Sequence, residues 1–219
     1  MTLSIVKDRF AFKVVNSSSM KWISRAALCS LFLSGLCLKG AGLASQEGNL
    51  FVGDRVFEID ISIPERGIAN LRTYHWQRWR GSGQPRPKAL ATIKAEGVVY
   101  TNVSVHLKGS AGSFRSVDDN PALTLNFDKH VKDQLFRGHD KIYLNNSVQD
   151  RSYSNEKICR ELYNAAGIPT PRSTHAWVTL NGRKLGLYVL IEGFNKRFLK
   201  RHFEDVSGNL YDGGFLQDI

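Results

Sequence analysis

A lysine beside a glycine-rich loop is the feature of this sequence best suited to chemistry. Lys108 ends an alternating apolar segment, and the loop Gly-Ser-Ala-Gly-Ser follows it directly. Glycines permit backbone conformations in which several N–H groups converge on a phosphate, and a nearby cation adds charge. We therefore assign Lys108, Gly109, Ser110, Gly112 and Arg115 to a candidate phosphate site. An ordinary glycine turn between two strands is the alternative interpretation.

Two acidic residues downstream can complete such a site. Glu161 lies within a predicted helix, where a carboxylate can orient a phosphate-binding lysine, as in kinase-like folds. Glu192 ends an apolar segment just before Gly193, so the backbone around it can frame the base of a nucleotide. The alternatives are a solvated helix residue for Glu161 and an ordinary strand end for Glu192. Glu156 is expected only to complement the dipole of the same helix.

Several other chemistries find no support in the sequence. The six histidines show no metal-ligand spacing, so no metal-binding residue is assigned. The P-loop spacing is absent, and so is the Gly-x-Ser-x-Gly motif of a hydrolase nucleophile. A cluster of basic and aromatic residues between Arg72 and Lys88 can be a nucleic-acid patch or a solvated helix face. We favour the solvated face and expect no nucleic-acid partner.

Alternating strands and a few helices are expected to position these residues. The Asn181-Gly182 pair favours a two-residue hairpin turn. The order of the elements predicts an α+β fold, in which an antiparallel sheet carries one principal packed helix. Cys159 is expected to be a buried thiol on the core-facing side of that helix. Strands are predicted at 56–63, 90–93, 98–107, 122–127, 141–145, 176–180 and 185–192, and helices at 67–79, from about 152 to 166, and at 196–203.

The first 44 residues have the layout of a secretory signal peptide. A basic segment, residues 20–25, precedes an apolar run of 13 residues at 26–38, and small residues follow at 42 and 44. The run is too short for an ordinary membrane span, although an N-terminal anchor or a buried helix is an alternative. We expect residues 1–44 to be removed and residues 45–219 to form one domain. The protein is expected to be secreted or to lie in the cell envelope, in the periplasm or outside the cell, with no stable membrane span after cleavage.

The charge of the chain suits an anionic ligand. The 219 residues include 30 Lys or Arg and 20 Asp or Glu, a net charge of +10. Residues 45–219 keep 24 basic and 19 acidic residues, a net charge of +5. Such a balance attracts an anion without requiring nucleic acid. Of the three cysteines only Cys159 lies outside the predicted signal peptide, so no disulfide is expected within the mature chain.

Several short motifs carry a family resemblance. Their order and spacing between Phe57 and Gly214 are similar to the N-terminal portion of the CotH family of atypical, spore-coat-type protein kinases. The resemblance implies a protein-kinase-like fold, ATP with Mg²⁺ or Mn²⁺, and phosphorylation of Ser or Thr in secreted or surface proteins. The motifs are Leu107-Lys-Gly-Ser110, Tyr143-Leu-Asn-Asn146, Asp150-Arg-Ser152, Asn181-Gly182 with Gly186–Glu192, and Gly208-Asn-Leu-Tyr211.

The sequence departs from the family pattern in two places. Asp119-Asn-Pro121 stands where the family often has one or two lysines. The family's catalytic aspartate and its metal-binding Trp-Asp segment lie downstream of Gly-Asn-Leu-Tyr, and neither occurs before Ile219. We therefore expect a fragment with weak or no activity and assign it no catalytic residue. A non-catalytic envelope or extracellular binding module, a degenerate kinase homologue, is the alternative, and a secreted hydrolase ranks behind both.

Overall fold

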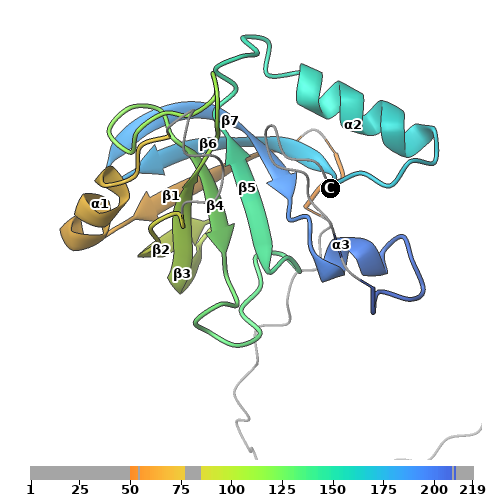
Figure 1. The fold of residues 1–219 in the computed structure, drawn as a ribbon, viewed down its shortest axis with the longest axis horizontal. Coiled ribbons are helices and arrows are strands. Elements are labelled where there is room, and N and C mark those ends of the chain that lie inside the picture. The colour runs from red at the N-terminus through yellow and green to blue at the C-terminus, as the bar shows by residue number, and fades with distance from the viewer. Residues whose placement is uncertain (1–49, 54, 77–84, 209, 211–219) are drawn as a thin grey trace, which may run out of the picture. The chain divides into compact units, whose positions relative to one another are not determined.

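A closed barrel of seven strands forms from the described part of the chain (Figure 1). The structure is a computed structural model that describes residues 50–53, 55–76, 85–208 and 210. The order of the strands around the barrel is β1-β2-β3-β4-β5-β7-β6. The strands are β1 (Val56–Ser62), β2 (Ala89–Ala95), β3 (Val98–Lys108), β4 (Ala122–Asn126), β5 (Lys141–Asn145), β6 (Ser173–Leu180) and β7 (Arg183–Glu192).

The barrel closes through a parallel pair between β1 and β6, and its other strand pairs are antiparallel. Val56 pairs with His175 at one end of this parallel ladder, and Ile61 pairs with Leu180 at the other. Closure removes the free sheet edges, which would otherwise expose unpaired backbone groups. The result is a mixed barrel in which β1 forms backbone hydrogen bonds with β6 and so closes the sheet.

The hydrophobic core fills the interior of the barrel. Every second residue of a strand points into it. On β1, Phe57, Ile59 and Ile61 are buried, and the residues between them are exposed. This alternation is what a period of two residues requires of a strand with one buried face. The hydrophobic cluster continues around the barrel through residues such as Ile93 and Leu190.

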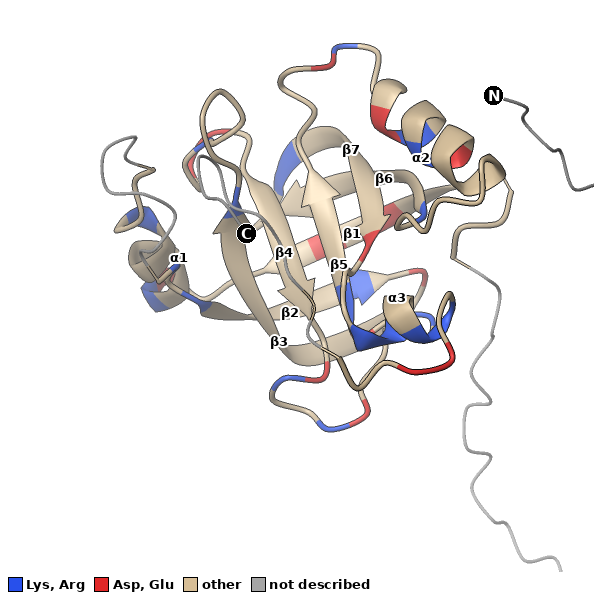
Figure 2. Ribbon diagram, turned by 45° about the vertical axis from the view of Figure 1, so that its right-hand side comes forward, with Lys and Arg blue, Asp and Glu red and all other residues tan. Residues whose placement is uncertain are grey.

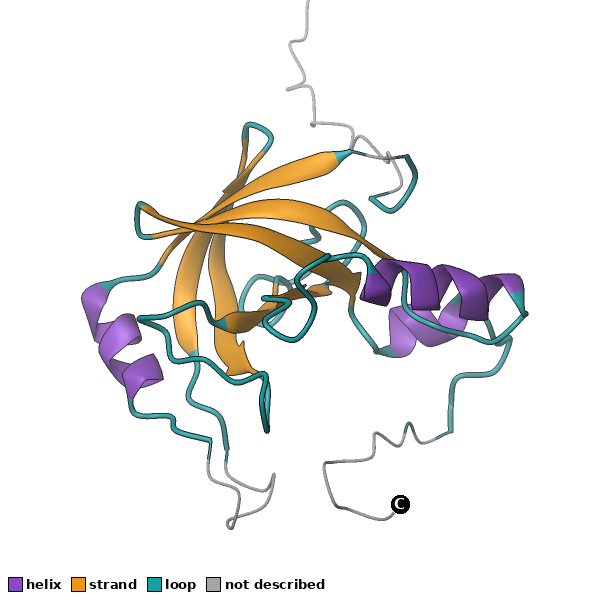
Figure 3. Cartoon of the chain, turned by 90° about the horizontal axis from the view of Figure 1, so that it is seen from above, coloured by secondary structure: helices purple, strands orange, loops and turns teal. Residues whose placement is uncertain are grey.

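Three short helices lie outside the barrel, with α1 on the side opposite α2 and α3 (Figure 3). They are α1 (Glu65–Arg72), α2 (Asn155–Ala165) and α3 (Lys196–Lys200). Helix α1 buries Ile68 and Leu71. Its Gly67 is required for close approach, because a Cβ there would lie 2.8 Å from the side chain of Ile63. Asn195 caps the N-terminus of α3, since its side chain accepts hydrogen bonds from two backbone N–H groups of the first turn.

The predicted α+β fold, an antiparallel sheet with one main packed helix, is wrong. The chain is mainly β, its sheet is mixed and closed, and α2 contains no buried residue. Helix α2 lies to one side of the barrel instead of across a sheet face (Figures 1 and 3). The expectation of a buried Cys159 is wrong for the same reason, since its side chain is exposed on this helix.

The predicted strands are confirmed as elements, with small shifts at their ends. The helix predicted at 67–79 is shorter and begins earlier, at Glu65 after Pro64, and it ends at Arg72. Several predicted features lie outside the described residues: the signal peptide at 1–44, the basic residues 78 and 80, and residues 209 and 211 of the 208–211 motif. No helix in the described ranges is long and apolar enough to cross a membrane.

Candidate functional site

Lys108 lies on the outer face of the barrel, at the end of β3. Its neighbour Leu107 is a core residue, so the alternation of the strand places the lysine side chain outside. The ammonium Nζ donates a 2.7 Å hydrogen bond to Oδ1 of Asn145, at the end of β5. It also lies 5.5 Å from the centre of the Tyr143 ring. Two strands that are not neighbours in the sheet therefore fix the position of the charge.

A polar chain continues from Asn145 to helix α2. Asn145 Nδ2 donates to Oε2 of Glu156 at 2.6 Å, and Arg160 donates to the other carboxylate oxygen at 2.7 Å. The Glu156 and Arg160 side chains are each less than a third exposed. Lys108, Asn145, Glu156 and Arg160 thus connect β3, β5 and α2. The helix carboxylate reaches the lysine through one intervening amide.

The loop from Gly109 to Phe114 is compact and held by its own hydrogen bonds. The N–H groups of Ser113 and Phe114 both donate to the carbonyl of Ser110, at 3.1 and 2.9 Å. Gly109 has φ +104°, and a Cβ there would meet the backbone of Phe114 at 3.0 Å. Gly112 has φ +79°, which favours glycine, and the atom 2.6 Å from a Cβ there is the mobile amide end of the Gln149 side chain. The backbone conformation at both positions favours glycine, and Gly109 alone is also limited by the close backbone of Phe114.

A pocket of about 330 Å³ opens between the loop, the end of β5 and the start of α2. Its size is in the range of small-molecule sites. Asn146 is a buried residue of the pocket wall. Its side-chain amide donates to the carbonyls of Ser113 and Asn120, so it holds the end of the glycine loop and the segment before β4 in place. The lining residues are Lys108, Gly109, Ser113, Ala122, Asn145, Asn146, Ser147, Val148, Gln149, Asp150, Asn155 and Glu156.

Asp150 brings a second carboxylate to the pocket. Its Oδ1 accepts from the Ser152 hydroxyl at 2.6 Å and from the Ser152 N–H, and its Oδ2 accepts from the N–H of Asn155. These hydrogen bonds, led by the Ser152 hydroxyl, lower the pKa of the Asp150 carboxyl. The carboxylate therefore ties the segment before α2 to the first turn of the helix.

The carboxylates of the pocket do not make a metal site by themselves. Both oxygens of Asp150 and both of Glu156 accept hydrogen bonds from protein groups. Among the described residues, no three His, Cys, Asp or Glu side chains are grouped as metal ligands would be. Lys108 gives the pocket a positive charge, which suits an anionic phosphate better than a cation.

A histidine lies further along the same outer face, and four cations act on it electrostatically. His106 precedes Lys108 by two residues, so both side chains lie on the same side of β3. His106 pairs with Thr124 of the neighbouring strand β4. Burial is the main cause that lowers the pKa of His106 to about 4, and the nearby cations lower it further. Its ring is therefore neutral at pH 7, beside a surface that is positive. The contributing cations are Arg86, Lys88, Lys141 and Lys129.

The other predicted site residues take different places. Arg115 donates to the carbonyls of Gly112 and Phe114, so it supports the loop. The Glu161 carboxylate is 67% exposed and lies 3.8 Å from Lys157 on the same helix. Among the described contacts the polar chain from Lys108 reaches Glu156 instead, although the sequence had indicated only a dipole role for that residue. The role predicted for Glu161 stays a prediction.

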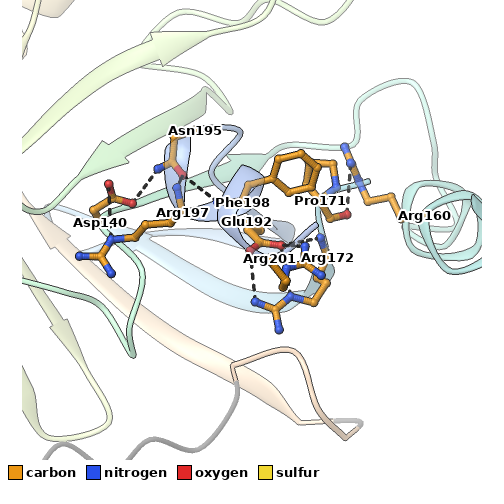
Figure 4. A network of polar contacts seen from close by, with 9 residues as sticks. All are labelled: Asp140, Arg160, Pro171, Arg172, Glu192, Asn195, Arg197, Phe198 and Arg201. Atoms are coloured by element: carbon orange, nitrogen blue, oxygen red, sulfur yellow. Dashed lines mark hydrogen bonds and ion pairs between the residues drawn. The ribbon is translucent and has the colours of Figure 1, made fainter. Parts of the chain in front are cut away.

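Glu192 lies at the other end of the sheet from the pocket. It is buried, and Arg172 and Arg201 contact its carboxylate at 3.1 and 2.5 Å (Figure 4). It pairs with Ile142 at the start of β5, whereas the pocket is at the end of β5. The next residue, Gly193, donates its N–H to the carbonyl of Lys141 at 3.0 Å. The two arginines engage the Glu192 side chain, and the backbone N–H groups of Glu192 and Gly193 donate to the carbonyls of Arg172 and Lys141, so the predicted contact of this segment with a base stays a prediction.

Comparison with known proteins identifies the family. A family model described as CotH kinase protein matches residues 105–219. The inner spore coat protein H of Bacillus subtilis (strain 168) is 31% identical over 73 residues, which are 33% of this chain and 20% of that protein. The match thus spans about a fifth of the relative's length. Because the family model covers more than half of the sequence, this chain belongs to the CotH kinase protein family.

Proposed function

We propose that this protein binds ATP on the outer face of its barrel, with the phosphates at Lys108 and the glycine loop. Membership of a kinase family implies the use of ATP. The observation that carries the placement is the chain from Lys108 through Asn145 to Glu156, which fixes a cation beside a compact glycine loop. Such a fixed cation binds phosphate without first losing side-chain freedom.

We place the rest of the nucleotide along β5, between the pocket and Gly193. Residues 141 to 145 of β5 cover about 13 Å at the usual rise of a strand. Buried groups on the outer face include Thr124, Val189 and Ile191, and none of them belongs to the core cluster. We place the base toward the backbone of 192–194, as the sequence had suggested for Glu192.

The parent activity that we propose for the family is transfer of the ATP γ-phosphate to Ser or Thr hydroxyls of secreted or surface proteins, and we propose that this chain performs it weakly or not at all. Lys108 neutralises phosphate charge, and Glu156 orients it through Asn145. Mg²⁺ or Mn²⁺ neutralises phosphate charge in such reactions, but the donor set of the pocket gives no reason to place one here. We propose export to the cell envelope or beyond on the basis of the sequence of residues 1–44.

A second candidate is a module that binds without catalysis. It is favoured by one observation, namely that protein donors already engage the oxygens of the pocket carboxylates, Asp150 and Glu156. A carboxylate engaged in this way is not available as a base. Such a module would bind nucleotide or another anion and transfer nothing.

Calorimetric titration of the full chain with ATP tests the proposal. The wild type should bind, and Lys108→Ala should weaken binding about 10-fold or more, because a hydrogen bond to a charged group is lost. Lys94→Ala, which removes an exposed lysine of β2, is the matched control and should bind normally. No binding by the wild type would overturn the proposal. Binding without transfer of labelled phosphate to a mixed protein substrate would favour the module.

A further inference from the structure

Arg86 makes two hydrogen bonds to the backbone on either side of Lys108. One terminal nitrogen donates to the carbonyl of Leu107 at 2.8 Å, and the other donates to the carbonyl of Gly109 at 2.9 Å. The planar fork of a guanidinium can span two carbonyls in this way, which the single ammonium of a lysine cannot do in the same geometry. Arg86, which lies outside β3, thus fixes the backbone on both sides of Lys108.

The same guanidinium connects to the far end of the loop through two rings. It lies 5.2 Å from the centre of the Tyr74 ring, which is almost buried. The Tyr74 ring meets Phe114 edge to face, with centroids 5.5 Å apart. Phe114 closes the loop, since its N–H donates to Ser110 and its backbone abuts Gly109. Arg86 and Tyr74 therefore fix both ends of the segment 109–114.

We propose that Arg86 is a positioning residue that holds Lys108 and the glycine loop in their phosphate-binding conformation. The inference rests on the proposed function for its ligand. Arg86 acts through the loop, because both of its terminal nitrogens are committed to carbonyls. It precedes residues 105–219, where the family model matches, so a segment outside the matched region contributes to the site. A loop fixed in advance binds its ligand with less loss of conformational freedom.

Two variants of the full chain separate positioning from charge. Arg86→Ala removes the fork and the charge, and Arg86→Lys removes the fork alone. Both should weaken ATP binding about 10-fold in calorimetric titrations, while the affinity for adenosine, which lacks phosphates, stays unchanged. Arg66→Ala, a control that removes an exposed arginine of α1, should leave ATP binding at the wild-type level.

Hydrogen exchange provides a readout that needs no nucleotide. The amides of Ser113 and Phe114 should exchange faster in both Arg86 variants, while amides of the β6–β7 hairpin keep wild-type rates. If Arg86→Ala does not fold, the exchange rates of the loop and hairpin amides are compared in Arg86→Lys and Tyr74→Leu instead. The hairpin rates show whether a variant has lost stability everywhere or only in the loop.

The possible outcomes separate the two claims. Wild-type ATP affinity in Arg86→Lys would overturn the inference, since charge alone would then suffice. Unchanged exchange at Ser113 and Phe114 in Arg86→Ala would also overturn it. Failure of the wild type to bind ATP, with faster loop exchange in the variants, would overturn the proposed function and leave Arg86 as the residue that fixes the loop.

Discussion

Glu156 and Glu161 are five residues apart on one short helix, yet their surroundings differ sharply. Glu156 is partly buried, and Asn145 and Arg160 contact its two oxygens. Glu161 is mostly exposed beside Lys157. A charge–charge contact at an exposed position contributes little, whereas a partly buried carboxylate that accepts two hydrogen bonds holds its partners in place. The sequence could place both acids on a helix but not show which of them faces β5.

A pair of conservative changes decides between these two acids. Glu156→Gln keeps the size of the side chain but weakens the charged acceptor for Asn145, so Lys108 should become less well fixed. We expect ATP affinity to fall about 3- to 10-fold in Glu156→Gln and to stay unchanged in Glu161→Gln. Calorimetric titration of the two variants measures this. A loss in Glu161→Gln alone would return the role to the residue that the sequence indicated.

His106 gives the stability of the protein a defined pH dependence. Its pKa is lowered to about 4 in the folded chain, mainly by burial, against 6.5 for an ordinary histidine. The unfolded chain therefore binds a proton that the folded chain refuses as the pH falls from 6.5 toward 4. The contribution of this ring to stability is fully present above pH 6.5 and is lost across that interval. Solvent screening of a partly buried ring limits the loss to about 1 to 2 kcal/mol.

Urea unfolding of the wild type and of His106→Asn, at about pH 7 and about pH 4.5, measures this contribution. The wild type should lose more stability between the two pH values than the variant does. Burial also lowers the pKa of His139 and His202, so the difference between the two proteins isolates His106. Equal losses in both proteins would show that the His106 ring titrates normally.

At the level of the elements, Asn181 performs two tasks in the β6–β7 hairpin. With φ +47° it forms the tight turn that the Asn-Gly pair predicts. Its side chain also accepts from the N–H of Ile63 at 2.7 Å and donates to the carbonyl of Ile63 at 2.8 Å. The turn residue thus mimics a backbone partner for the end of the first strand. This contact extends the parallel ladder that closes the barrel.

Two substitutions in the turn separate these tasks. Asn181→Gly keeps the left-handed backbone and removes both side-chain hydrogen bonds, so it should lower the free energy of unfolding by about 1 to 3 kcal/mol. Gly182→Ala keeps the hydrogen bonds and adds only backbone strain, since nothing lies within 4 Å of its new methyl group. It should cost about 1 kcal/mol. Urea unfolding compares them, and an unchanged Asn181→Gly would mean that closure does not depend on this side chain.

Local signals in the sequence predicted most elements, but not the way in which they close. Glu96 and Gly97, like Asn181 and Gly182, have positive φ in their turns, and such pairs announce hairpins between neighbouring strands. The contact between β1 and β6 joins residues more than a hundred positions apart and has no turn to mark it. Parallel pairing over that distance depends on the complementary inner faces of the whole barrel, which a local pattern does not reveal.

For the molecule as a whole, the sequence pattern of α2 predicts that the helix has an apolar face. The pattern does not show which part of the molecule covers that face. Figure 2 shows acidic and basic residues on one part of this helix, and the rest of it is uncharged. Ile158, Leu162 and Tyr163 are each more than half exposed. The sequence therefore located the helix and its apolar stripe correctly, and the inference that the stripe packs on the sheet was wrong. On its polar side, Glu156 contacts Asn145 of β5, and Arg160 contacts the carbonyl of Pro171, just before β6.

The exposure of Ile158 and Leu162 leads to a prediction about both the stability and the solubility of the protein. Replacing Ile158 and Leu162 with Gln should change the free energy of unfolding by no more than about 0.5 kcal/mol, because neither side chain is buried. The same pair should reduce the binding of a hydrophobic dye and raise the concentration at which the protein aggregates. Leu190→Ala, a truncation in the core, is the contrasting control and should cost about 2 to 5 kcal/mol. A comparable loss in the Ile158/Leu162 pair would show that this face of α2 is covered in solution, since only a buried surface can supply that much stability.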